Sequence, residues 1–302
     1  MLTQRRRTMH ITRRNFLKAG ALGAAGALPL LRMKAHADVN IRLGACDWSL
    51  GVANTPESFD VAKAIGLDGV EVSATGDVGE KMDIADPARR QAYKDAMDKT
   101  GLVVSSVAMG CLNNYPFATD ERAPAWLEQT IEATADLGAK VILLAFFGKG
   151  DLLEKKGLLS RGGGLKEKEV DTVVERLIAA APMAKDAGVI IGLENTLSAE
   201  QNLSILKRVN HESVQVYYDI GNSTYNGYEV PAEIRQLDKL ICQIHFKDGG
   251  YALGEGKVDM DAVAAAMGDI NYSGWVVLET AIRNNDRDAS FEKNVEFVRQ
   301  MF

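Results

Sequence analysis

The chain is poor in the residues that build disulfide-rich domains and zinc fingers. Among its 302 residues are three cysteines, Cys46, Cys111 and Cys242, and this odd, widely spaced set predicts neither a disulfide framework nor a cysteine-based zinc motif. Two of the four histidines, His211 and His245, lie beyond residue 37. That later part also lacks a stretch that is long and apolar enough to cross a membrane.

The first 37 residues contain no acidic side chain and have the order of features expected of an export signal. A TRRNFLK segment at 12–18 precedes a mild apolar run at 19–31, and AHA at 35–37 offers small residues for cleavage. We predict a twin-arginine signal peptide over 1–37, the twin-arginine export machinery as a partner, and a periplasmic or otherwise exported protein. An uncleaved N-terminal anchor and an ordinary amphipathic helix are the alternatives.

Removal of the predicted leader leaves a strongly acidic chain. Residues 1–37 hold eight of the 35 basic residues, so the remaining 27 stand against 41 acidic residues, a net charge of −14. Such a surface repels phosphate backbones, and nucleic acid is therefore not expected as a partner. No low-complexity segment or linker divides residues 38–302, which predicts one domain.

Short β-branched runs alternate with helical patterns along this domain. The predicted strands are 41–46, 69–73, 102–108, 140–146, 189–194, 214–219, 241–246 and 275–279. The clearest amphipathic helices are 87–100, 124–138, 167–187 and 288–302. This alternation predicts a single-domain (β/α)8 TIM barrel over 38–302. A doubly wound open sheet would instead need a glycine-rich turn after the first strand, where the chain has CDWS at 46–49.

Each of the last four predicted strands ends with a side chain that can bind a metal. These residues are Glu194, Asp219, His245 and Glu279, spaced 25, 26 and 34 residues apart. One βα unit per interval places all four at the C-terminal face of a barrel, where barrel active sites lie. Period-two alternation predicts that Tyr217 and Gln243 also point into the barrel.

Three carboxylates in one cluster need a positive counter-charge, because they otherwise repel one another and raise their pKa values. A divalent metal ion would supply that charge. The oxygen-rich set with a single imidazole predicts one Mn(II) ion, or else Mg(II), Co(II) or Fe(II), rather than a structural zinc ion. For each residue taken alone, a helix N-cap or an ion-pair partner is the more ordinary interpretation.

Five segments around these strand ends carry a resemblance to a known superfamily. They are GLEN at 192–195, YDIGN at 218–222, IHFKD at 244–248, GEGKVD at 254–259 and LET at 278–280. Together they resemble the xylose-isomerase-like barrels, which include ketose 3-epimerases, hydroxypyruvate isomerase, inosose dehydratase and, more distantly, endonuclease IV. The resemblance extends over 38–302 and implies a small-molecule carbohydrate or polyol as the substrate, without naming it.

The mechanism of that superfamily implies a role for each of the four residues. In the ketose epimerases a Glu-Asp-His-Glu set binds one metal, and the two glutamates lie on opposite faces of the carbon that is inverted. By resemblance, Glu194 and Glu279 are the acid and base of a proton transfer next to a carbonyl as well as ligands. Asp219 and His245 are then ligands only.

Two positions depart from the ketose-epimerase pattern. Asn222 stands where these enzymes commonly have a histidine, and Lys247 stands where they tend to have an arginine. We predict substrate contacts by both residues, by Trp48 after the first strand and by Glu71 in the second. Packing at the rim is the alternative for Trp48, and a solvated ion pair is the alternative for Lys247.

The leading functional hypothesis is a metal-dependent sugar or polyol isomerase or epimerase. A lyase or dehydratase acting on keto-sugars or their glycosides could use the same metal set, and a non-catalytic sugar-binding barrel is a third hypothesis. The three-zinc site of endonuclease IV needs several histidines, and His245 is the one histidine predicted at the catalytic face. The long segment 148–166 could act as a lid, and the tyrosines near residue 217 could support a homo-oligomer.

Overall fold

The computed structural model describes residues 39–154 and 163–302, so the predicted leader over 1–37 lies outside the described residues. Its strands form one closed barrel in sequence order, and every pairing is parallel. The strands are β1 (Asn40–Cys46), β2 (Gly69–Ser73), β3 (Val103–Met109), β4 (Val141–Phe146), β5 (Ile190–Asn195), β6 (Val214–Asp219), β7 (Ile241–Phe246) and β8 (Ser273–Leu278). The predicted TIM barrel is confirmed.

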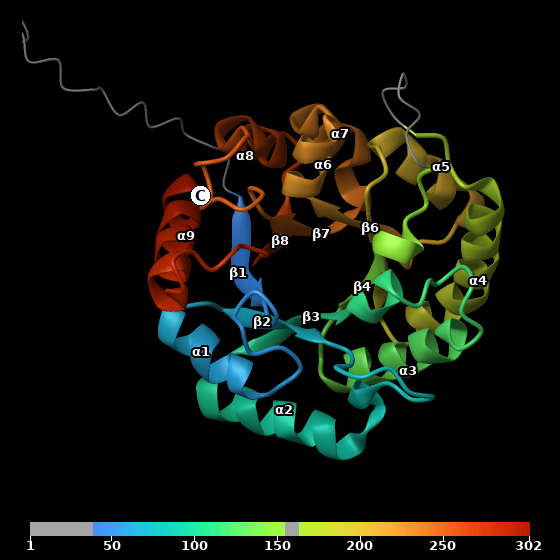
Figure 1. The fold of residues 1–302 in the computed structure, drawn as a ribbon, viewed down its shortest axis with the longest axis horizontal. Coiled ribbons are helices and arrows are strands. Elements are labelled where there is room, and N and C mark those ends of the chain that lie inside the picture. Colours follow the sequence, from blue (N-terminus) through green and yellow to red (C-terminus); the bar gives the residue numbers. More distant parts are fainter. Residues whose placement is uncertain (1–38, 155–162) are drawn as a thin grey trace, which may run out of the picture. The chain divides into compact units, whose positions relative to one another are not determined.

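Helices surround this barrel, as the ring of coiled ribbons in Figure 1 shows. The described α-helices are α1 (Glu57–Ile65), α2 (Pro87–Thr100), α3 (Ala123–Asp136), α4 (Glu167–Asp186), α5 (Ala199–Val209), α6 (Ile220–Asn226), α7 (Val230–Leu237), α8 (Met260–Asp269) and α9 (Arg287–Met301). Short 3₁₀ turns are η1 (Asp83–Ala85), η2 (Gly110–Asn113), η3 (Gly148–Gly150) and η4 (Asp238–Leu240). Within the described ranges, none of the helices has both the length and the apolar character to span a membrane.

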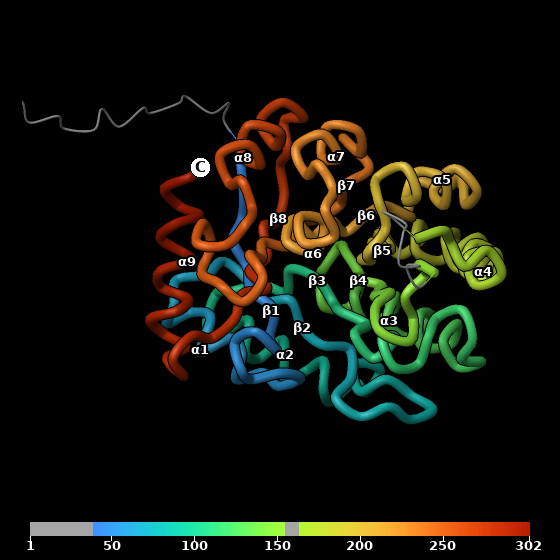
Figure 2. The backbone as a smooth tube through the Cα atoms, turned by 45° about the horizontal axis from the view of Figure 1, so that its top comes forward, coloured from blue at the N-terminus to red at the C-terminus, as the bar shows by residue number. Residues whose placement is uncertain are grey.

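Pairing between the first and last strands closes the barrel. The register runs from Asn40 opposite Ser273 to Ala45 opposite Leu278. In Figure 2, β1 in blue and β8 in red accordingly lie side by side although they come from opposite ends of the domain. The closure leaves no free sheet edge and brings the C-terminal ends of all the strands to one face.

Local signals in the sequence explain where the helices begin and end. Asp86 caps α2 by accepting the Ala88 amide, and Pro87 occupies the first helical turn, where no amide donor is needed. A capping box of Ser198 and Gln201 starts α5. Gly101 follows α2 with a φ of 73°, a left-handed conformation that a side chain disfavours, and so ends this helix as its position predicts.

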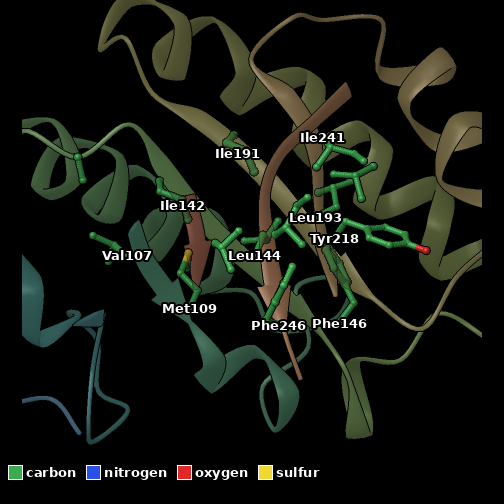
Figure 3. Close-up of a cluster of buried hydrophobic side chains, with 14 of the residues drawn as sticks. Val107, Met109, Ile142, Leu144, Phe146, Ile191, Leu193, Tyr218, Ile241 and Phe246 are labelled. Atoms are coloured by element: carbon green, nitrogen blue, oxygen red, sulfur yellow. The ribbon is translucent and has the colours of Figure 1, made fainter. Parts of the chain in front are cut away.

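Alternate residues of the strands face two different cores. The outward-facing residues of β3 to β7 pack under the helices, and Figure 3 labels Val107, Met109, Ile142, Leu144, Phe146, Ile191, Leu193, Tyr218, Ile241 and Phe246. A smaller inward-facing cluster consists of Ala108, Val141, Leu143, Ala145 and Tyr217. Because two of these five residues are alanines, the barrel interior keeps space for a cavity at the end where the strands finish.

Candidate metal centre and active site

The structure brings Glu194, Asp219, His245 and Glu279 together at the C-terminal face. Glu194 lies in β5, Asp219 ends β6, His245 lies in β7, and Glu279 follows the last residue of β8. Each residue offers one ligand atom, and these atoms all lie within 4.8 Å of one another. Atoms that bind one ion at about 2.1 Å can be at most about 4.2 Å apart, so the cluster is close to the geometry of a metal site.

Asp219 has one oxygen that is satisfied by the protein and one that is not. Oδ1 accepts the Asn222 amide at 2.8 Å and thereby caps α6, the ordinary role weighed for this residue from the sequence. Oδ2 is buried without a hydrogen-bond partner in the described part of the chain, and the Lys247 amine lies 3.8 Å away. Burial and the nearby Glu279 raise the pKa of Asp219 well above its usual value although Lys247 acts to lower it, so Lys247 compensates this carboxylate only in part.

The two glutamates of the cluster are held by different partners. Glu194 Oε1 lies 2.8 Å from His245 Nδ1, and burial raises the pKa of Glu194 although His245 acts to lower it. Glu279 accepts hydrogen bonds from Lys247 Nζ at 2.8 Å and from Trp48 Nε1 at 3.3 Å. Burial acts to raise the pKa of Glu279, but the neighbouring His245 and Lys247 outweigh it and the pKa is lowered.

These residues fit a divalent ion by their chemistry. Three carboxylates and one imidazole face a single point with Lys247 as the cation beside them, and one buried oxygen of Asp219 has no partner among the described residues. An ion bound at this point would satisfy that oxygen and compensate the negative charge. The oxygen-rich ligand set suits Mn(II), Mg(II), Co(II) or Fe(II).

A cavity of about 430 Å³ opens beside this cluster, within the size range of small-molecule sites. Among the site residues predicted from the sequence, those that line this cavity are Trp48, Glu194, Asn222, Lys247 and Glu279. The sequence interpretation missed the polar and aromatic lining residues Ser73, Thr75, Cys111, Asn113 and Phe147. They lie at or just after the ends of β2, β3 and β4, so the rule that barrel sites gather after strand ends could have found them.

A family model described as xylose isomerase-like TIM barrel matches residues 59–301. The chain belongs to this family. A model of the twin-arginine translocation signal sequence matches residues 10–29, so the N-terminal segment is a signal for export by the twin-arginine route. Both matches confirm what the sequence motifs predict.

Several family relatives are named as sugar epimerases. SgbU of Escherichia coli (strain K12), provisionally named an L-ribulose-5-phosphate 3-epimerase, is 28% identical over 249 residues, covering 74% of this chain and 82% of that protein. L-ribulose-5-phosphate 3-epimerase UlaE of Salmonella paratyphi C (strain RKS4594) is 26% identical over 237 residues, covering 74% and 81%. The structure of 3-keto-D-glucoside 4-epimerase YcjR from E. coli aligns with a TM-score of 0.71 at 20% identity, covering 86% of this chain and 100% of that chain, and shares the fold.

Glu71 does not lie where the predicted substrate contact requires it to be. Its side chain is fully buried in the middle of β2 and is absent from the cavity wall. Glu71 Oε1 lies 2.9 Å from His245 Nε2 and 3.4 Å from the Cys46 thiol. The geometry thus places Glu71 beside His245 and away from the predicted substrate contact, and a carboxylate in this place can fix which ring nitrogen carries hydrogen.

Glu71 also belongs to a network of buried, hydrogen-bonded polar side chains. Its Oε2 accepts hydrogen bonds from Ser106 at 2.5 Å and from Tyr217 at 2.8 Å. The Gln243 amide donates to both of these hydroxyls at 2.8 Å, so their own hydrogens point to Glu71. The predicted inward orientation of Tyr217 and Gln243 is confirmed.

Gly221 allows the segment after β6 to approach the segment after β7 closely. It lies in α6, two residues after Asp219, and a Cβ at this position would come within 2.6 Å of the Lys247 carbonyl oxygen. Such a contact cannot form without a shift of the backbone. The glycine of the YDIGN motif is therefore needed to place Lys247 against Asp219 and Glu279.

The remaining sequence predictions lie farther from the cavity. Leu153 and Leu165 form an antiparallel bridge at the base of the segment 148–166, but its residues 155–162 lie outside the described residues and the lid stays a prediction. The Tyr218 hydroxyl donates to Glu233 of α7, so this tyrosine packs within one chain, and the homo-oligomer stays a prediction too.

Proposed function

We propose that the chain is a metal-dependent sugar epimerase that inverts a carbon next to a carbonyl. The observation that carries this proposal is the pair Glu194 and Glu279, which line one cavity and share a cluster with an Asp219 oxygen that has no hydrogen-bond partner among residues 39–154 and 163–302. The names of the relatives support the reaction class, because each of them describes a sugar epimerase.

The ion would be held by Glu194, Asp219, His245 and Glu279. When bound, it would polarise the substrate carbonyl and so acidify the neighbouring C–H bond. His245 would donate its Nε2 hydrogen to Glu71, which leaves the Nδ1 lone pair to face the cluster. The buried network thus selects the tautomer of His245 that suits a metal ligand.

The chain itself would move the proton with two carboxylates held in place. Lys247 and Trp48 fix Glu279 from two sides, while His245 holds Glu194 across the cluster. One glutamate would remove the proton from the carbon next to the carbonyl. The other would return a proton to the opposite face, which inverts the carbon and conserves the mass of the substrate.

The test combines metal analysis with proton exchange on the full chain. Elemental analysis should find about one equivalent of a divalent metal, lost in the double variant Glu194→Gln/Glu279→Gln. With D-fructose and other ketoses, the wild type should exchange the proton next to the carbonyl with solvent deuterium, and each single variant should be slower by about 100-fold or more. Glu233→Gln is the matched control, since Glu233 is a buried glutamate outside the cluster.

Two results would contradict the proposal. Exchange that persists in both single variants would remove the glutamates from the reaction. A wild type that binds metal and sugar but exchanges no proton with any ketose would favour the sugar-binding barrel instead.

A further inference from the structure

A second cavity of about 340 Å³ adjoins the first one at the C-terminal face. The two cavities share the side chains of Trp48, Lys247 and Glu279 as a common wall. The second cavity, here called the outer lobe, continues along the β8–α9 loop to Thr280 and Ile282. A ligand whose reacting carbon lies at Glu279 can therefore extend from the first cavity into the outer lobe.

The walls of the outer lobe have both apolar and hydroxyl-binding character. Ile282 is 38% exposed, which is unusual for a large apolar residue in this chain, and the Trp48 indole forms the wall toward the first cavity. Trp48 is held by its hydrogen bond to Glu279. Thr280 also lines the lobe, but its hydroxyl oxygen is buried, so the polar groups that the wall offers a ligand are the Lys247 amine and the Glu279 carboxylate. A sugar ring matches such walls, because it presents C–H faces to apolar groups and hydroxyls to polar ones.

The charges around the two cavities do not favour a phosphate group. Among the lining residues that the structure describes, Lys247 is the one cation. Its amine is already engaged by Glu279 at 2.8 Å and lies 3.8 Å from Asp219. Phosphate sites in proteins usually combine several cationic or amide donors. A sugar phosphate in the outer lobe would instead lie beside the carboxylate of Glu279.

We propose that the outer lobe is a subsite for an uncharged sugar ring, so that the substrate is an unphosphorylated keto-sugar carrying a glycosyl substituent. This inference rests on the proposed epimerase function for the reacting end of the substrate. It differs from the relatives named for ribulose 5-phosphate, whose substrate carries a phosphate. The twin-arginine signal agrees with it, since the exported chain works away from the cytoplasmic pool of sugar phosphates.

Four commercial sugars separate the effects of length and charge. Isomaltulose and D-fructose 6-phosphate extend fructose at the same oxygen, one with a neutral glucosyl ring and the other with a phosphate, while lactulose extends it at another oxygen. With the full chain loaded with Mn(II), calorimetry should show at least one disaccharide binding about tenfold or more tightly than D-fructose. D-fructose 6-phosphate should bind more weakly than D-fructose. Equal binding of D-fructose and both disaccharides, or tightest binding of the phosphate, would overturn the subsite.

A substitution in the outer lobe locates the effect. Ile282→Trp should fill the lobe and lower the disaccharide-to-fructose affinity ratio by about tenfold. Ile178→Trp is the matched control, since Ile178 is an exposed isoleucine on α4 away from both cavities, and it should leave that ratio at the wild-type value. A ratio that does not fall in Ile282→Trp, or that falls equally in both variants, would contradict the subsite.

Deuterium exchange on the same sugars separates this inference from the proposed function. Tight disaccharide binding without exchange of any sugar would overturn the epimerase and keep the subsite. Exchange of D-fructose without a preference for either disaccharide would keep the epimerase and overturn the subsite.

Discussion

Replacing Glu71 with glutamine removes one buried negative charge below His245 and preserves the shape of the side chain. Glu71 is fully buried and lies 2.9 Å from His245 Nε2, so water cannot take the place of the lost carboxylate oxygen. The new amide must also present a donor either to His245 or to Ser106 and Tyr217, whose hydroxyls now donate to Glu71. The substitution therefore disturbs the hydrogen bonds that orient a metal ligand.

We expect Glu71→Gln to weaken Mn(II) binding by about 100-fold, or about 2.7 kcal/mol. Partners of a metal-binding histidine contribute about 10- to 100-fold to affinity, and complete burial favours the upper end of that range. Calorimetric titration of the metal-free full chain with Mn(II) measures the change. Circular dichroism should show that the variant keeps the fold of the wild type.

Glu233→Gln is the control for the loss of a buried glutamate as such. Glu233 accepts a hydrogen bond from the Tyr218 hydroxyl at 2.8 Å, much as Glu71 accepts one from Tyr217, but it lies in α7 and outside the candidate metal-ligand groups of the described residues. The Glu233→Gln variant should bind Mn(II) with the affinity of the wild type. The reasoning fails if Glu71→Gln binds Mn(II) as the wild type does, or if both variants lose the same affinity.

Three further outcomes follow from single contacts. Gly221→Ala should lower the free energy of unfolding in urea by about 1–3 kcal/mol because its Cβ meets the Lys247 backbone, whereas Gly250→Ala, with open space, should change it little. Burial, partly offset by hydrogen bonds from Ser73 and Asn54, raises the pKa of Asp47 from 3.8 to about 6. Between these two pH values the folded chain binds more protons than the unfolded chain, so Asp47 makes the free energy of unfolding fall as the pH rises. In Asp47→Asn the free energy of unfolding should fall less steeply over the same pH range. Mn(II) at about 100 times its Kd should raise Tm by about 5–10 °C and leave the Glu194→Gln/Glu279→Gln variant unchanged.

Strand order and the four metal-cluster residues could be predicted from the sequence because both follow from local patterns. Strand and helix periodicities are properties of short segments, and a closed parallel barrel brings every strand end to one face. Four ligand-type residues at consecutive strand ends must therefore meet. The structure has β8 begin two residues and end one residue earlier than predicted, which leaves Glu279 at the same face just beyond the strand.

The position of Glu71 beside His245 was decided by the tertiary structure alone. Its residue type and its strand could be read from the sequence, but its partner His245 is 174 residues away. Whether a side chain in the middle of a strand reaches the cavity or lies beneath it depends on the stagger between strands, which no local pattern records. The outer lobe likewise arises where the loops after β1, β7 and β8 meet, because loop paths depend on packing across the whole barrel face.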